Sequence, residues 1–359
     1  MKTVCLSLLF LSLTITGNSQ DAHDPSLFSV NGFLETYYVY DFNRPENSVR
    51  PAFIYSHNRH NEVNLNLGFV KVGYNAEAVR ANLALMAGTY ANANLAAEPG
   101  VLKSIYEANA GVKISGNKDL WIDAGIFSSH IGFESAHSPR CWTLTRSILA
   151  DNTPYYEAGA KITYTSDNGK WLLSGLVLNG WQRIQRVEGN SLPSFGTQVT
   201  YKPNSAVTLN SSTFIGTDKP DSARQMRFFH NFYGIFQVSE KMGLIVGFDY
   251  GVEEESPETH STNPWLTPVI IARLVLNEKT VIAVRGEYYG DEKGVVITTG
   301  TENGFKTTGL SANFDYQIAS YALWRFEVRN LTSRDKIFVR GEELSKSNTY
   351  VTTSLAISF

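Results

Sequence analysis

The sequence predicts a single antiparallel transmembrane β-barrel of about 16 strands, within a range of 14 to 18. Three observations lead to this fold class: residues alternate between apolar and polar with period two, short and long connections alternate between the strands, and the chain ends on an apolar strand. The 359 residues are 43% hydrophobic and 12% aromatic, with a formal net charge of −3. This composition excludes a disordered chain, and it offers no basic face for nucleic acid.

The N-terminus is predicted to be a signal peptide comprising residues 1–19. Lys2 supplies the positive start, residues 4–15 are apolar apart from Ser and Thr, and Ser19 is a small residue suited to cleavage. Past residue 20 no apolar run reaches the roughly 18 residues that a spanning helix needs. The barrel is therefore expected to comprise residues 20–359 in one domain.

Alternation with period two is clearest in six segments. In the first of them, Leu83 and Leu85 lie on one face of an extended strand, while Arg80 and Asn82 lie on the other. Helical periodicity is poor throughout the chain after the signal peptide. The six segments are 79–87, 155–165, 194–202, 281–290, 307–318 and 321–329.

The connections predict which end of the barrel faces which side. Short turns alternate with longer, more polar connections, and the first and last strands both begin or end on the short-turn side. This arrangement is typical of transmembrane barrels, which have tight periplasmic turns and longer external loops. The short turns are expected near 75–78, 115–119, 166–169, 202–206, 239–242, 277–280 and 318–320, and the long loops near 41–60, 92–104, 131–153, 184–194, 217–223, 254–264, 290–304 and 331–348.

Three features fit the barrel less well. Segments 171–178 and 269–276 are apolar on both faces, as a strand buried on both sides in a soluble protein would be. Segment 227–238 has aromatic residues on both sides, and Pro268 lies just inside a strand expected to begin at Trp265. A soluble secreted β protein therefore stays open as a minor alternative.

Charged residues on the polar faces are predicted to line a water-filled lumen. An Arg or Lys at the lipid midplane costs about 2–4 kcal/mol, so the charged face of each strand must point inward. Acidic and basic candidates nearly balance, so no ion preference is predicted. The predicted lining residues are Arg80, Glu107, Lys113, Glu157, Lys161, Arg285, Glu287, Asp315, Arg325, Glu327 and Arg329.

The last strand has the form of a targeting signal. Leu355, Ile357 and Phe359 share one face of the terminal strand, and an aromatic last residue resembles the end of bacterial outer-membrane barrels. This ending implies recognition by the barrel assembly machinery and a location in the outer membrane of a Gram-negative bacterium, in contact with its lipid.

Short stretches lie in a fixed order over essentially the whole mature chain: NGFLETYY (31–38), DFN (41–43), AGIF (124–127), HIGFE (130–134), RSIL (146–149), PYYEAG (154–159), LNGW (178–181), RGEYY (285–289) and RFEVR (325–329). In this order they resemble the OmpL-like β-barrel porin family. The resemblance implies passive diffusion of small hydrophilic solutes or ions. After Trp181, residues 182–185 depart from the Asp/Asn-rich residues expected there, and Cys141 is atypical.

The longest connection, residues 131–153, is the third external loop by order. Porins commonly fold this loop into the lumen, and here it combines charge with an aromatic anchor. We expect it either to form a constriction or to remain an ordinary surface loop. The candidate constriction residues are Glu134, Arg140, Trp142 and Arg146.

No catalytic motif or cofactor site is predicted. The chain has no G-x-S-x-G, P-loop, G-x-G-x-x-G, H-E-x-x-H or C-x-x-C sequence. His130, Glu134 and His137 are spaced like metal ligands, but polar residues of a loop explain them better. A porin, with a homo-oligomer left open, is the main expectation. The alternatives are a structural or adhesive barrel, a channel subunit of a larger assembly and, as a weaker option, a barrel phospholipase or protease.

Overall fold

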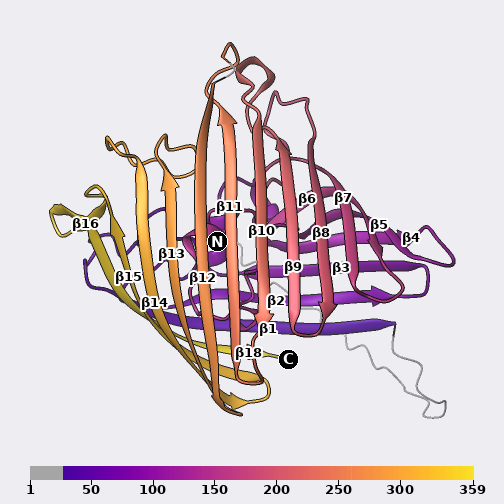
Figure 1. The fold of residues 1–359 in the computed structure, drawn as a ribbon, viewed down its shortest axis with the longest axis horizontal. Helices are drawn as coiled ribbons and strands as arrows, with labels where there is room; N and C mark the ends of the chain where they lie inside the picture. The colour runs from indigo at the N-terminus through magenta and orange to yellow at the C-terminus, as the bar shows by residue number, and fades with distance from the viewer. Residues whose placement is uncertain (1–26, 260) are drawn as a thin grey trace, which may run out of the picture.

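The wall of the molecule is a closed ring of sixteen antiparallel strands. The computed structural model describes residues 27–259 and 261–359, so the predicted signal peptide lies outside the described residues. Each wall strand pairs with its neighbours along the chain, and β18 (Ser347–Ser358) closes the ring against β1 (Phe28–Asp41) (Figure 1). The other wall strands are β2 (Val63–Asn75), β3 (Val79–Ala87), β4 (Ile105–Lys113), β5 (Asp119–Ser128), β6 (Tyr156–Thr165), β7 (Trp171–Leu178), β8 (Ser194–Asn204), β9 (Val207–Gly216), β10 (Arg227–Gln237), β11 (Met242–Glu254), β12 (Thr262–Asn277), β13 (Thr280–Asp291), β14 (Phe305–Ala319) and β15 (Ala322–Ser333).

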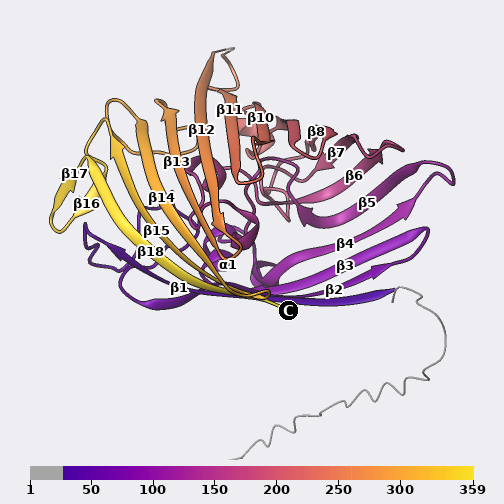
Figure 2. The same cartoon turned by 60° about the horizontal axis from the view of Figure 1, so that its bottom comes forward.

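The remaining elements lie in the connections between wall strands. A small hairpin of β16 (Phe338–Arg340) and β17 (Glu343–Ser345) lies between β15 and β18. The α-helices are α1 (Thr89–Asn94) and α2 (Ile148–Asp151), and helical turns of the long loops lie within the ring of strands in Figure 2. No helix in the described ranges is long and apolar enough to cross a membrane.

Short turns and long loops occupy opposite ends of the barrel, which confirms the predicted organisation. The seven connections at the short-turn end have two to five residues, and the eight at the long-loop end run from 255–261 up to 129–155. The strand number agrees with the predicted value of sixteen. Alternating connection lengths are thus a direct consequence of an even-stranded ring in which both chain ends lie on the same side.

The two faces of the wall differ in polarity as the alternation predicts. On β15, Trp324 and Val328 are exposed on the outside, whereas Arg325, Glu327 and Arg329 point inward and are buried. Charged side chains are absent from the middle of the outer face among the described strands. Lipid cannot solvate a charge, so this outer surface suits a hydrocarbon environment.

The two segments that are apolar on both faces have a local explanation. Leu176 and Leu178 on β7, and Val269 and Ile271 on β12, point inward and are buried. Long loops enter the barrel and cover these positions, so the inner face of each segment packs against protein instead of water.

Pro268 lies in the interior of β12, which begins at Thr262, three residues before the expected start. The proline pairs with Phe248 of β11. On the β13 side, pairing is recorded at Leu266 with Gly290 and resumes at Val269 with Glu287. The missing N–H of proline therefore falls in a gap of the β12–β13 ladder, which keeps the same register on both sides.

Candidate functional site

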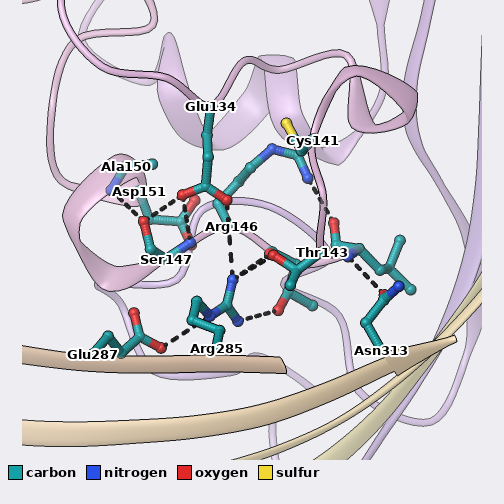
Figure 3. A network of polar contacts seen from close by, with 12 residues as sticks. Glu134, Cys141, Thr143, Arg146, Ser147, Ala150, Asp151, Arg285, Glu287 and Asn313 are labelled. Carbon is teal, nitrogen blue, oxygen red and sulfur yellow. Dashed lines mark hydrogen bonds and ion pairs between the residues drawn. The ribbon is translucent and has the colours of Figure 1, made fainter. Parts of the chain in front are cut away.

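The loop between β5 and β6, residues 129–155, lies inside the barrel and is called the inner loop from here on. Three of its backbone N–H groups donate to inward side chains of β13, β14 and β15, and Figure 3 shows the wall residues Arg285 and Asn313 in polar contact with the loop. Thr145 N lies 2.6 Å from Glu327 Oε2, Ile148 N lies 2.7 Å from Glu287 Oε2, and Leu144 N lies 2.9 Å from Asn313 Oδ1. These bonds fix the backbone of the inner loop against β13, β14 and β15.

Three arginines of the same strands also bind the loop, because their guanidinium groups donate hydrogen bonds to its carbonyl oxygens. The distances are 2.7 Å from Arg285 Nη1 to Thr145 O, from Arg325 Nη1 to Ser138 O, and from Arg329 Nη1 to Arg146 O. Each arginine also pairs with a carboxylate on the wall: Arg285 with Glu327, Arg325 with Asp315 and Arg329 with Glu287.

We call these seven wall residues the anchor ladder: Arg285, Glu287, Asn313, Asp315, Arg325, Glu327 and Arg329. All of them point inward, as the alternation predicts. The inner loop covers them, so they bind protein groups and each other instead of facing an open water path. Their charges balance at three arginines against three carboxylates, which lets the ladder be buried at a tolerable desolvation cost.

The inner loop is also bonded to other parts of the wall. Ser138 Oγ donates to Glu35 Oε1 of β1 at 2.5 Å, and Gly132 N donates to Asn231 Oδ1 of β10 at 3.1 Å. The loop is therefore bonded to β1, β10 and β13 to β15, so it crosses the interior of the barrel.

Two predicted constriction residues, Glu134 and Arg146, stabilise the loop itself. Glu134 Oε2 accepts a hydrogen bond from Ser147 N at 3.0 Å and another from the Ser147 hydroxyl. The Arg146 guanidinium donates to Ser135 O and Leu144 O, both at 2.6 Å. Both side chains are buried, so they set the shape of the loop and present no charge to water.

The other two candidates of the loop, Arg140 and Trp142, lie closer to open space. The Arg140 side chain is exposed, and the Trp142 ring is half-buried. The Arg273 guanidinium of β12 lies 4.5 Å from the centroid of that ring, a cation–π contact. Arg140 is therefore the charged group that the inner loop turns toward solvent.

The remaining predicted lining residues point inward from β3, β4 and β6. Arg80 donates to both carboxylate oxygens of Asp123, at 2.7 and 2.6 Å. Glu107 pairs with Lys71, and Glu157 is fully buried against His130 at 2.8 Å. Lys113 and Lys161 are half-exposed.

Several inward cations form no ion pair with any carboxylate of the described residues, and we call four of them the basic lumen face. In two of the inward pairs the cation is also the more exposed partner: 29% for Lys71 against 13% for Glu107, and 32% for Arg80 against 4% for Asp123. In the pair of Arg325 and Asp315 the carboxylate is the more exposed partner, at 13% against 0%. In the pairs of Lys71 and Arg80, the charge that reaches water is thus mostly positive. The basic lumen face comprises Lys113, Arg140, Lys161 and Arg273.

Burial perturbs three titratable groups of the inner loop. It lowers the pKa of His137 to about 4, an effect that Arg140 and Arg146 reinforce. Burial raises the pKa of the Asp151 carboxyl to about 7, although Arg329 and Arg146 oppose this shift. The Cys141 thiol is free and buried, and burial raises its pKa. Its sulfur packs within the loop, 3.4 Å from Ser135 O.

Sequence reasoning missed Lys71, Asp123 and Arg273. Lys71 and Asp123 do alternate with apolar neighbours, so their inward orientation was available from the pattern. Arg273 lies in the segment that is apolar on both faces, where the pattern does not separate inside from outside. The described residues contain no group of three His, Cys, Asp or Glu that could hold a metal ion.

Residues 27–359 match the family described as "Putative beta-barrel porin-2, OmpL-like". The chain belongs to this family. The porin lies in the outer membrane of a Gram-negative bacterium and forms a passive channel, so its long-loop end is external and its short-turn end periplasmic. None of the curated proteins with which the porin was compared matches it.

Solved structures share the fold of the porin at low sequence identity. The anion-selective porin from Comamonas acidovorans is 10% identical with a TM-score of 0.59, over 92% of this chain and 99% of that one. The outer membrane channel DcaP of Acinetobacter baumannii is 14% identical with a TM-score of 0.59, over 92% and 97%. A mutant of the Rh. blastica porin is 11% identical with a TM-score of 0.56, over 92% and 100%.

Proposed function

We propose that this porin is a diffusion pore that favours small anions, and that the basic lumen face sets the preference. The observation that carries the proposal is the unequal exposure of the lumen charges. Lys113, Arg140, Lys161 and Arg273 reach water without a carboxylate partner among the described residues, whereas the inward carboxylates of the wall are mostly paired or buried.

The position of these cations suits selection of the passing ion. Arg80 and Lys113 lie close to the periplasmic ends of β3 and β4, Lys161 lies in the middle of β6, and Arg140 lies on the inner loop. Rings of basic side chains along a narrow aqueous path lower the electrostatic barrier for anions and raise it for cations. The effect weakens with salt, because the screening length falls to about 10 Å at 0.1 M.

We propose further that the inner loop is the constriction of the pore. Its bonds to strands β1, β10 and β13 to β15 support this role, because a loop fixed on several sides narrows the space that it crosses. In this proposal Arg140 is the constriction residue that ions meet, Trp142 packs against Arg273 of the wall, and Glu134 and Arg146 hold the loop in shape. Arg285, Glu287, Asp315, Arg325, Glu327 and Arg329 bind the loop, and Glu157 holds its first residues through His130.

The preference is tested by the zero-current potential of the pore in a planar bilayer with a KCl gradient. We expect the sign that corresponds to a higher permeability of chloride than of potassium. Replacing Arg140, Lys161 and Arg273 together by Gln is expected to bring the permeability ratio at least two-fold closer to one. Lys279→Gln, in an exposed periplasmic turn, is the matched control and leaves the ratio unchanged. A wild-type preference for potassium, or an unchanged ratio in the triple variant, would overturn the proposal.

We propose that the porin carries out no covalent chemistry and needs no cofactor. The relevant rival is a barrel hydrolase with a lipid-facing nucleophile, and one pair on the outer face bears on it. Ser211 Oγ lies 2.8 Å from His230 Nε2, but the other ring nitrogen has no hydrogen-bond partner among the described residues. A general base without an orienting group is poorly prepared for catalysis. Release of fatty acid from phospholipid by the wild type, abolished in Ser211→Ala, would contradict this proposal.

We also propose a homo-oligomer and insertion by the barrel assembly machinery through the last strand. One solved neighbour, OmpT of Vibrio cholerae, is described in a trimer form, at 9% identity and a TM-score of 0.56. At the C-terminus, Phe359 O accepts a hydrogen bond from Gly32 N at 2.6 Å, and the Phe359 side chain is exposed. Chemical cross-linking in native membranes tests the oligomer, and the inserted fraction of a variant lacking Phe359 tests the recognition.

A further inference from the structure

A cavity of about 930 Å³ opens among the external loops, away from the basic lumen face. Loop 42–62, loop 292–304 and the connection that holds β16 and β17 surround it, and Phe53 and Asn152 are among the residues that line it. This volume lies within the range of ordinary small-molecule pockets. The anion preference proposed above makes no use of this cavity.

Buried polar groups line the cavity with unused hydrogen-bonding capacity. The Arg50 side chain is fully buried and donates from Nη1 to His57 O at 3.1 Å, but its Nε and Nη2 have no hydrogen-bond partner among the described residues. Asp41 Oδ2 and Asn348 Oδ1 are also buried and accept no hydrogen bond from the described residues. Asp41 Oδ2 lies 3.9 Å from Arg50 Nε, which is too long for a hydrogen bond.

Unpartnered groups of this kind are costly, at about 1–3 kcal/mol each, which favours an occupant that satisfies them. The free groups comprise two donors on Arg50 and two acceptors, one on Asp41 and one on Asn348. A hydroxyl group donates and accepts at the same time, so adjacent hydroxyls of one molecule match this mixture. A carboxylate would meet the Arg50 donors, but it would face Asp41 Oδ2 directly.

The surroundings of these atoms fit the same chemistry. The charged residues that line the cavity balance, with Asp41 and Glu46 against Arg50 and Lys336, so a neutral ligand is not disfavoured. Apolar side chains complete the lining, among them Phe53, Phe305 and Ile337. Such surfaces pack against the C–H faces of a sugar ring, while the polar groups bind its hydroxyls.

The polar groups are held in place before any ligand arrives. The Arg50 guanidinium lies 3.6 Å from the centroid of the Tyr350 ring. Asp41 Oδ1 accepts hydrogen bonds from Asn43 N at 2.9 Å and from Asn348 Nδ2 at 2.7 Å. The site therefore pays little ordering cost on binding.

We propose that this external cavity is a binding site for a neutral polyhydroxylated solute, of the size of a short oligosaccharide. Arg50 binds hydroxyl oxygens, and Asp41 and Asn348 accept from hydroxyl hydrogens. The site captures its ligand at the mouth of the pore.

The test is isothermal titration of the purified mature porin in detergent micelles with maltotriose and with cellotriose, and with citrate as an anionic comparison. Two variants probe the cavity. Arg50→Gln removes the donors, and Ala52→Trp places a bulky ring in the cavity from its exposed rim. Ala223→Trp, on an exposed external loop outside the cavity, is the matched control. Heat-modifiable gel mobility shows that each variant is folded.

We expect saturable binding of at least one trisaccharide at one site per chain, weakened at least ten-fold in Arg50→Gln and in Ala52→Trp and unchanged in Ala223→Trp. If Arg50→Gln does not fold, Ala52→Trp decides alone. The proposal is overturned if neither trisaccharide binds, if binding survives in Ala52→Trp, or if citrate binds through Arg50 and the sugars do not. The zero-current potential is measured separately, so the anion preference and the sugar site can each fail without the other.

Discussion

Arg285 of β13 and Glu327 of β15 form an ion pair across the intervening strand β14, with 2.8 Å between Nη2 and Oε1 and both side chains 0% exposed. The same two residues grip one residue of the inner loop: Arg285 donates to Thr145 O at 2.7 Å, and Glu327 accepts from Thr145 N at 2.6 Å. The Thr145 backbone N–H and carbonyl groups reach Glu327 and Arg285 only when the loop is inside the barrel. The ion pair is therefore part of the mechanism that keeps the loop in place.

Glu327→Ala is expected to lower the free energy of unfolding by about 3–5 kcal/mol, because it leaves Arg285 buried without its closest carboxylate. The midpoint of heat-induced mobility change on a gel measures this loss, and single-channel current noise should rise as the loop loosens. Glu343→Ala, in the exposed hairpin of β16 and β17, serves as control and should shift stability by no more than about 0.5 kcal/mol. Equal midpoints for the two variants would show that the pair does not hold the loop.

Neighbouring residues of the inner loop should differ sharply in chemical reactivity. Cys141 is buried and burial raises its pKa, so the wild type should react with a membrane-impermeant maleimide at least ten-fold more slowly than an exposed thiol. In a Cys141→Ala background, Arg140→Cys should react readily, since the Arg140 side chain is exposed to the lumen. Mass spectrometry of the labelled porin measures both rates. Rapid labelling of native Cys141 would contradict the described packing of the loop.

The fold was largely predictable because period-two alternation and connection length are local properties of the sequence. In segment 321–329 the alternation of polar and apolar residues predicts which side chains point inward, and the burial pattern of β15 agrees with that prediction. Segment 269–276 shows no such alternation, because the inner loop packs against Val269 and Ile271 inside the barrel and both faces of the strand are therefore apolar. The alternation rule holds for strands whose inward side chains face water, so it fails for strands whose inward side chains pack against protein.

The site was predictable in composition but not in exposure. The sequence indicated that Arg325 and Arg329 point inward, and they do. It did not indicate that these arginines bind the carbonyl groups of Ser138 and Arg146, nearly two hundred residues away along the chain. The near balance of acidic and basic candidates hid the unequal exposure on which the proposed anion preference rests, since the exposure of Lys161 and the burial of Glu157 depend on long-range packing.

Stability should fall with rising pH through the titration of Asp151. Burial raises the pKa of this carboxyl from 3.8 to about 7, so the folded chain holds a proton that the unfolded chain releases between about pH 4 and pH 7. The stabilisation is fully present below pH 4 and is lost as pH rises through 7. The shift corresponds to roughly 4 kcal/mol.

The thermal midpoint of the wild type should therefore decrease from pH 5 to pH 8 more steeply than that of Asp151→Asn, which cannot titrate at this position. Asp167→Asn, at an exposed periplasmic turn, is the control and should follow the wild type. Parallel pH profiles for the wild type and Asp151→Asn would rule out a raised pKa at this site.

Replacing residues 134–146 by a short Gly-Ser linker should open the pore. This segment carries the contacts of Ser138 and Thr145 with the wall, so its loss removes the material that crosses the interior and uncovers the anchor ladder. We expect a several-fold rise in single-channel conductance in 1 M KCl. The anion preference should weaken in the wider pore, because Arg140 is removed and a wider path is screened more strongly.

The control is the same linker in place of 256–259, an external segment between β11 and β12, which should leave conductance unchanged. Unchanged conductance after replacement of 134–146 would mean that the inner loop does not set the narrowest part of the path, and the constriction would then lie among the external loops.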